Sequence, residues 1–151
     1  FKTKSTPAGN VEKSVNQLQL AIASGCGFVA AGFSANQKQL VEIIKRAILH
    51  PGFSLVSTYS PCVTFNRVNT FDFFKQHLVN LDEDPTYDRH DRFAAMKKLM
   101  ETEELVTGII YEDPASVPYE DRVAGYRKEG IVNQDWTMDP AVWEQLVSQY
   151  R

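Results

Sequence analysis

The chain has 151 residues, a size that suits one domain able to bury roughly two thirds of its unfolded surface. Hydrophobic residues make up 43% and charged residues 23% of it, as in an ordinary globular protein. A net charge of -3 without a basic stripe argues against nucleic acid as a partner, and no apolar run approaches the roughly 18 residues of a membrane span. We therefore expect a cytoplasmic protein that binds neither nucleic acid nor a membrane.

The first residue is Phe1 rather than Met, and the opening segment resembles the middle of a loop. We therefore expect the chain to be a fragment of a longer protein. Essential groups would then lie upstream of Phe1.

Two short apolar segments and the region between them predict a β-α-β unit. Residues 28–33 are continuously apolar and predict a strand buried on both faces. Residues 53–59 predict a second strand, which Pro61 ends because it removes a backbone donor. The intervening helix opens with a capping box at 34–37 and ends before Pro51. Its predicted inward stripe is Leu40, Val41, Ile44, Ala47 and Ile48. The unit implies a parallel sheet with a right-handed crossover.

The other segments predict helices and one further strand around this unit. A first helix is expected to open with a capping box at 14–17 and to end at Gly25. Residues 70–79 and 91–103 predict two more helices, the second burying its apolar side chains: Phe93, Met96, Leu99 and Met100.

The remaining segments follow in chain order: an acidic surface loop at 82–88, a strand at 105–112 broken by Gly108, a short helix at 119–126, and a last helix after Asp139. We expect residues 1–66 to be half of an α/β domain and residues 67–151 to be an extension packed on it.

Cys62 is the candidate functional residue, because it follows the second strand of the unit directly. Ligands of open parallel sheets bind at the carboxyl ends of the strands. Pattern alone nevertheless favours a buried, reduced thiol for both Cys62 and Cys26. Strand geometry places the two cysteines at opposite sheet edges, too far apart for a disulfide.

The histidines and the acidic loop predict no second site. His50 is expected to complement a helix C-terminus, and His77 and His90 to lie on helix surfaces. No spacing predicts zinc, and residues 82–88 lack the spacing of a calcium loop. Gly25 and Gly27 precede a strand, whereas a dinucleotide-binding loop follows one.

Four segments in chain order resemble the thiamine-diphosphate-binding β subunit of 2-oxoacid:ferredoxin oxidoreductases, most closely the 2-oxoglutarate type. They are residues 6–10, 23–30, 50–54 and 60–66, the last reading Ser-Pro-Cys-Val-Thr-Phe-Asn. Residues 84–95 and 118–122 are similar to that family's C-terminal region. One difference is Ala31, where many relatives carry arginine.

The resemblance implies the C-terminal part of a thiamine-diphosphate-binding α/β fold. It implies a hetero-oligomer with an α subunit that decarboxylates a 2-oxoacid, passes the acyl group to coenzyme A and reduces ferredoxin. The implied cofactors are thiamine diphosphate, Mg²⁺ and a 4Fe-4S cluster, with Cys62 as one cluster ligand. The motif for diphosphate and magnesium and the other cluster cysteines are expected upstream, so the fragment alone should be inactive. Thr3, Lys4 and Thr6 are candidates for the active-site approach.

Two alternatives stay open on the residues alone. The chain could be a subunit-assembly or binding module without chemistry of its own, in which Cys62 is a structural thiol. It could also belong to an iron-free thiamine-dependent decarboxylase or carboligase. Residues upstream of Phe1 would separate these alternatives from the oxidoreductase.

Overall fold

A computed structural model describes residues 6–123, 129–135 and 137–150. Its internal contacts divide the chain into two units, Phe1–Pro118 and Tyr119–Arg151. Among the described residues, no helix has the length and apolar character needed to cross a membrane.

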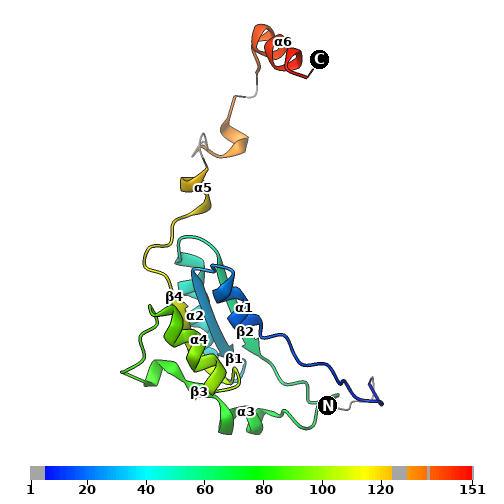
Figure 1. The fold of residues 1–151 in the computed structure, drawn as a ribbon, viewed down its shortest axis with the longest axis vertical. Helices are drawn as coiled ribbons and strands as arrows, with labels where there is room; N and C mark the ends of the chain where they lie inside the picture. Colours follow the sequence, from blue (N-terminus) through cyan, green and yellow to red (C-terminus); the bar gives the residue numbers. More distant parts are fainter. Residues whose placement is uncertain (1–5, 124–128, 136, 151) are drawn as a thin grey trace. The chain divides into compact units, whose positions relative to one another are not determined.

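The first unit is built on a four-stranded sheet with the order β2-β1-β4-β3 (Figure 1). Strand β1 (Phe28–Phe33) pairs in parallel with β2 (Ser54–Tyr59), and α2 (Gln37–Leu49) connects them. The predicted β-α-β unit is therefore confirmed. Every residue of β1 is buried, as its continuous apolar sequence predicts.

The sheet is mixed rather than wholly parallel. Strand β4 (Val106–Glu112) runs antiparallel to β1, while β3 (Val79–Asn80) pairs with β4 in parallel. A segment of seven mostly apolar residues suits a parallel or an antiparallel strand, so its sequence does not predict the direction of β4. Gly108 lies inside β4 instead of breaking it, with φ of 105° and only 2.9 Å between an added Cβ and Asp82 Oδ1.

Helices cover both faces of the sheet (Figure 1). On one face, α1 (Gln17–Ala23) and α4 (Arg92–Glu101) pack on the β1 side chains Val29 and Ala31. On the other face, Ile43 of α2 packs with Phe28, Ala30 and Ile109. The unit thus has three layers, with β1 at the centre of the core.

The inward face of α2 differs from the predicted stripe. Ile43 is buried and Ala47 packs beside it, whereas the exposed fractions of Val41, Ile44 and Ile48 are 49%, 42% and 76%. The apolar side chains of α2 cover more of the helix surface than the core contacts. Periodicity alone therefore centres the predicted buried stripe on the exposed Ile44 instead of on Ile43.

The inward face of α4 is also narrower than predicted. Leu99 and Ala95 are fully buried and Met96 packs against them, but Phe93 is 85% and Met100 70% exposed. The sequence of one helix does not show how much of its apolar face the neighbouring layer will cover.

The two predicted capping boxes begin two residues later than expected. Asn16 caps α1 and Asn36 caps α2, each through a side-chain oxygen that accepts from Gln19 or Gln39 respectively. The predicted Ser14 and Ser34 are not the caps, because the helices start at Gln17 and Gln37.

The segment between β2 and β4 contains α3 (Phe71–His77), the 3-10 helix η1 (Leu81–Glu83) and α4. The predicted surface loop at 82–88 therefore begins inside a short helix whose Leu81 is buried.

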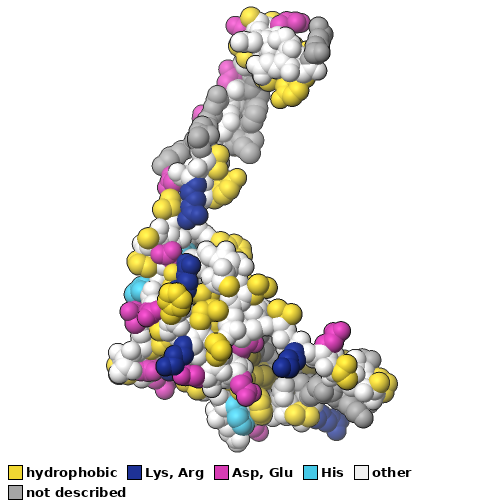
Figure 2. Space-filling model, in the orientation of Figure 1, with side chains coloured by type: hydrophobic (Ala, Val, Ile, Leu, Met, Phe, Trp, Pro, Cys, Tyr) yellow, Lys and Arg dark blue, Asp and Glu magenta, His cyan; other side chains and the backbone are white. Residues whose placement is uncertain are grey.

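The second unit has no buried side chain among its described residues. It contains α5 (Tyr119–Arg122), the 3-10 helix η2 (Ile131–Asn133) and α6 (Pro140–Ser148), which Asp139 caps as predicted. The predicted helix 119–126 extends into residues outside the described part. Hydrophobic side chains reach the surface in both units (Figure 2), and α6 exposes Trp143.

Candidate functional site at the carboxyl edge of the sheet

Cys62 lies where the sequence predicts, three residues beyond the end of β2. Because β1 and β2 are parallel and in register to Phe33 and Tyr59, their carboxyl ends share one edge of the sheet. Cys62 is exposed at this edge. The interpretation of Cys62 as a buried structural thiol, favoured by pattern alone, is therefore wrong, because the turn carries its side chain to the surface.

Local hydrogen bonds define the turn that carries Cys62. The amide of Asn66 donates to the Cys62 carbonyl at 3.0 Å. The Asn66 side chain then accepts from the amides of Val68 and Asn69 at 2.9 and 3.0 Å. Asn66 therefore closes the loop from both sides, which explains why an Asn suits this position.

The backbone of this turn favours the thiolate form of Cys62. Amides of Phe65, Thr64 and Asn66 donate toward the sulfur and lower the pKa of the Cys62 thiol. A thiolate that is exposed and held by amide donors is the form that binds soft metal ions and iron-sulfur clusters.

Cys26 has the opposite environment. It is buried, and its thiol lies 3.1 Å from the Phe28 carbonyl and 3.4 Å from the Phe53 carbonyl, to which it donates. Burial raises the pKa of the Cys26 thiol. The prediction of a buried, reduced thiol is confirmed for Cys26, which links the starts of β1 and β2 rather than facing the ligand edge.

Cys62 belongs to no complete set of metal ligands in the described part of the chain. No group of three or more His, Cys, Asp or Glu side chains lies close enough together there to hold a metal ion. The donor type at Cys62 fits an iron-sulfur cluster, but the other ligands of such a cluster would come from residues outside those described.

Two buried polar atoms near the same edge lack partners within the described residues: Ser34 Oγ and Glu104 Oε1. Ser34 follows β1, and its amide donates to the Tyr59 carbonyl. The Tyr59 hydroxyl in turn donates to the Glu104 carbonyl, and burial raises the pKa of Tyr59 to about 12. Buried groups without partners are rare, so this edge is incomplete as described.

Sequence reasoning misses Ser34 and Glu104. The sequence pattern makes Ser34 a helix cap, and Glu104 lies between a helix and a strand without any motif. No sequence signal marks either residue. In the structure, Glu103 and Glu104 adopt positive φ of 49° and 66° just after α4.

Glu104→Gln is expected to stabilise the chain at neutral pH. Burial raises the pKa of Glu104 above its ordinary value of 4.5, so the folded state disfavours the carboxylate. The resulting penalty is absent at low pH, where the carboxyl is protonated in both states, and develops as the pH rises through 4.5. Thermal unfolding from pH 3 to 8 should show that the Tm of the variant rises relative to the Tm of the parent chain above pH 4.5. An advantage that is the same at pH 3 and pH 7 would contradict this explanation.

The histidines have structural surroundings. His50 forms the C-cap of α2 through its amide, but its ring lies against Phe28 with centroids 5.5 Å apart, and its buried Nε2 has no hydrogen-bond partner among the residues that the structure describes. The helix end is therefore capped by the backbone amide of His50, which donates to the Arg46 carbonyl at 2.9 Å, and not by the His50 ring as predicted. His77 ends α3 and stacks on Phe73, as expected for a helix surface. His90 lies in a turn before α4, not on the helix, with Nδ1 2.7 Å from the Glu112 carbonyl.

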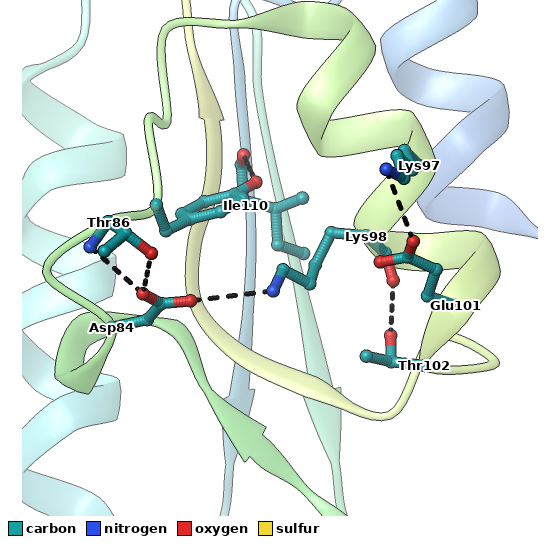
Figure 3. Close-up of polar contacts among 8 residues, drawn as sticks. Asp84, Thr86, Lys97, Lys98, Glu101, Thr102 and Ile110 are labelled. Atoms are coloured by element: carbon teal, nitrogen blue, oxygen red, sulfur yellow. Dashed lines mark hydrogen bonds and ion pairs between the residues drawn. The ribbon is translucent and has the colours of Figure 1, made fainter.

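The segment 84–87 is fixed against α4 and β4 by its own polar contacts (Figure 3). Asp84 accepts from the amide and hydroxyl of Thr86 at 3.0 and 2.6 Å, and Lys98 Nζ lies 3.6 Å from its other oxygen. These contacts lower the pKa of Asp84. The Tyr87 hydroxyl donates to the Ile110 carbonyl. The acidic stretch is thus an anchored turn rather than a free loop.

Among the candidates for the active-site approach, Thr3 and Lys4 lie outside the described residues. Thr6 is described and exposed. Ala31, the position that differs from many relatives, is fully buried in β1.

Comparison with known proteins identifies relatives of this arrangement. The family model for the C-terminal region of the pyruvate ferredoxin oxidoreductase β chain matches residues 62–128, beginning at Cys62. The 2-oxoacid:ferredoxin oxidoreductase subunit β of Saccharolobus solfataricus is 35% identical over 133 residues, covering 82% of this chain and 44% of its own. The 2-oxoglutarate synthase subunit KorB of Archaeoglobus fulgidus is 41% identical over 92 residues, covering 54% and 34%.

A solved structure has the same fold. It is described as 2-oxoglutarate:ferredoxin oxidoreductase from Magnetococcus marinus with 2-oxoglutarate, coenzyme A and succinyl-CoA bound, and it matches with a TM-score of 0.73 and 26% identity. The match covers 97% of this chain and 48% of that one. The chain spans less than half the length of the curated relatives it matches. From its sequence and its fold, the chain belongs to the family of 2-oxoacid:ferredoxin oxidoreductase β subunits, as the C-terminal part.

Proposed function

We propose that this chain is part of a β subunit that oxidatively decarboxylates a 2-oxoacid, transfers the acyl group to coenzyme A and reduces ferredoxin. The observation that carries the proposal is Cys62: an exposed cysteine with amide donors around it, at the ligand edge, in a segment related to this family. Because the chain spans less than half the length of its curated relatives, we expect it to be inactive by itself.

Cys62 would hold one iron of a 4Fe-4S cluster. When bound, such a cluster supplies one-electron transfer. The turn around Cys62 would stabilise the thiolate through the amides of Thr64, Phe65 and Asn66, and Asn66 would keep that turn closed. Hydrogen bonds to a cluster sulfur are one of the ways in which proteins set its reduction potential.

Thiamine diphosphate and Mg²⁺ would bind outside the described residues. The resemblance assigns their motif to sequence upstream of Phe1, and no group of three or more His, Cys, Asp or Glu side chains able to hold a metal ion lies among the described residues. Ser34 Oγ and Glu104 Oε1 are buried without a hydrogen-bond partner among the described residues. This supports the proposal that groups from the rest of the complete enzyme contact this edge of the sheet.

The substrate is proposed to be 2-oxoglutarate rather than pyruvate. The KorB relatives are named for 2-oxoglutarate, and the similar solved structure is described with 2-oxoglutarate and succinyl-CoA bound. The test uses the complete enzyme with coenzyme A and ferredoxin, and compares kcat/KM for 2-oxoglutarate and pyruvate. A higher value for 2-oxoglutarate is expected. A higher value for pyruvate would contradict the substrate assignment, and no coenzyme A-dependent reduction of ferredoxin with either acid would contradict the reaction.

An α subunit is the proposed partner, in a hetero-oligomer. The support comes from the second unit, where α6 leaves Trp143, Leu146 and Val142 exposed by 57%, 39% and 48%. A nine-residue helix is too short to be stable in water by itself, so these side chains need a partner surface.

The assembly-module alternative keeps this partner but gives Cys62 no ligand role. The iron-free decarboxylase alternative predicts thiamine-dependent activity without iron. The iron content of the complete enzyme tests the iron-free decarboxylase. The iron content of its Cys62→Ala variant tests the assembly module, because only the oxidoreductase requires a cluster that depends on Cys62.

A further inference from the structure

The loop that carries Cys62 is not held in its middle by the apolar core of the described chain. Residues 60–70 contain no helix or strand on the way from β2 to α3 (Figure 1). Val63, Phe65 and Val68 are exposed by 69%, 67% and 64%. The shape of this part of the loop must therefore come from its own hydrogen bonds.

Aromatic rings fix both ends of the loop to the sheet. Tyr59 is the last residue of β2, and its ring lies against the ring of Phe74 in α3, with centroids 5.2 Å apart. The rings of Phe71 and Phe74 also contact Phe33 at the end of β1, with centroids 5.8 and 5.9 Å apart. The loop therefore leaves the ligand edge and returns to it at one aromatic cluster, which keeps its ends in place.

Asn66 fixes the middle of the loop. Its Oδ1 accepts from the amides of Val68 and Asn69 at 2.9 and 3.0 Å, and its own amide donates to the Cys62 carbonyl at 3.0 Å. Apart from Cys62 itself, no other side chain of residues 60–69 forms a hydrogen bond within the described part of the chain. The backbone between Cys62 and Asn69 therefore depends on one amide side chain.

This stretch of backbone supplies the donors around the Cys62 sulfur. The amides of Phe65, Thr64 and Asn66 donate toward it. Reduction adds negative charge to a cluster, so amide donors to a ligating sulfur stabilise the reduced state more than the oxidised state. A loop that keeps these amides in place raises the reduction potential, and a loop that lets them turn away lowers it.

We propose that Asn66 is a positioning residue for the iron-sulfur cluster: by accepting from the amides of Val68 and Asn69, it keeps the donor amides directed at the Cys62 sulfur and raises the reduction potential of the cluster. This inference rests on the proposed ligation of the cluster by Cys62. Asn66 acts through the backbone and is not itself a ligand. Because the aromatic cluster keeps the ends of the loop in place, loss of the Asn66 side chain should change the potential without releasing the cluster.

Three neutral substitutions in the complete enzyme test the role of the Asn66 side chain. Asn66→Ala removes the acceptor, whereas Asn66→Ser keeps an oxygen that can accept from the same amides, although more weakly. Asn69→Ala is the matched control, because it removes the same kind of side chain from the same loop and keeps the backbone amide that donates to Asn66. Arg67 is the only charged residue in 60–70 and stays in all three, so a change of charge cannot explain a shift.

A redox titration followed by EPR measures the cluster whose signal Cys62→Ala removes. Asn66→Ala should keep its iron and acid-labile sulfide but lower the midpoint potential by the equivalent of about a tenfold change in the ratio of reduced to oxidised cluster, about 59 mV for one electron. Asn66→Ser should recover most of this shift, and Asn69→Ala should show none. An unchanged potential or a lost cluster in Asn66→Ala would overturn the proposal, as would an equally large shift in Asn66→Ser or Asn69→Ala.

Hydrogen exchange resolved to single residues tests the geometry of the loop independently of the potential. In the complete enzyme, the amides of Val68 and Asn69 should exchange at least about 10-fold faster in Asn66→Ala than in the parent, because they lose their acceptor. Asn69→Ala should leave the exchange of Val68 unchanged. Equal exchange of Val68 and Asn69 in Asn66→Ala and the parent would overturn the proposal.

The result for Cys62→Ala separates this proposal from the proposed function. If Cys62→Ala keeps every cluster signal, the assignment of Cys62 as a ligand is wrong. If Cys62→Ala removes a signal whose potential is the same in Asn66→Ala and the parent, the ligand assignment stands and the positioning role of Asn66 is wrong.

Discussion

Replacing Leu99 with alanine is expected to lower the free energy of unfolding by about 2–5 kcal/mol. Leu99 is fully buried in the cluster that joins α1 and α4 to the sheet, together with Leu18, Ile22 and Ile110. The substitution removes a large apolar side chain from water-free surroundings and leaves a cavity, because helix and sheet relax only partly.

Met100→Ala is the matched control for Leu99→Ala. It removes a side chain of similar size from the next position of the same helix, but Met100 is 70% exposed. Its effect should stay within about 0.5 kcal/mol. Urea unfolding of both variants measures the difference. Equal losses for Leu99→Ala and Met100→Ala would contradict the orientation of α4, and would favour the wider buried stripe expected from the sequence.

Replacing Gly27 with alanine is the second change with a large expected effect, a loss of about 1–3 kcal/mol from overpacking. A Cβ at Gly27 would come within 2.6 Å of Ser116 Oγ and 2.8 Å of His50 Nε2. Ser116 is held by the bond that its hydroxyl donates to the Pro51 carbonyl, and the His50 ring packs on Phe28. Neither group can withdraw without losing these contacts.

Gly130→Ala is the control for Gly27→Ala, since a Cβ at Gly130 meets nothing within 4 Å. Thermal unfolding should show a clear drop in Tm for Gly27→Ala and almost none for Gly130→Ala. Adding Ser116→Gly to Gly27→Ala should recover part of the loss, because it removes the closest clashing atom. A double variant that is additive, with no recovery, would refute the steric explanation.

The sequence predicts the β-α-β unit and the place of Cys62 because these depend on local signals. Continuous apolar residues define β1, Pro61 ends the region of β2, and Cys62 follows within three residues. Local chemistry is enough when a strand is bounded by such signals. The exposure of Cys62 was not predictable, because burial depends on what the turn meets in space.

Other features depend on long-range packing and could not be predicted. The direction of β4 is set by its pairing with β1, and the same apolar run would serve a parallel strand. Val41 and Ile44 match a buried stripe as well as Ile43 does, but they are exposed because the core contacts only the part of α2 that carries Ile43 and Ala47. Glu104 carries no sequence signal, since its burial comes from contact between Tyr59 and the end of α4.

The proposed binding of a 4Fe-4S cluster by Cys62 is tested most directly by iron analysis of the complete enzyme, with Cys62→Ala compared with Cys26→Ala. Iron and acid-labile sulfide per αβ unit, visible absorption and the EPR spectrum of the reduced protein report the cluster without relying on turnover. Cys62→Ala should lose one cluster, or convert it to a form with fewer irons, while Cys26→Ala retains it because Cys26 is buried away from the ligand edge. The same iron, sulfide and EPR signal in Cys62→Ala as in the parent enzyme would contradict the claim.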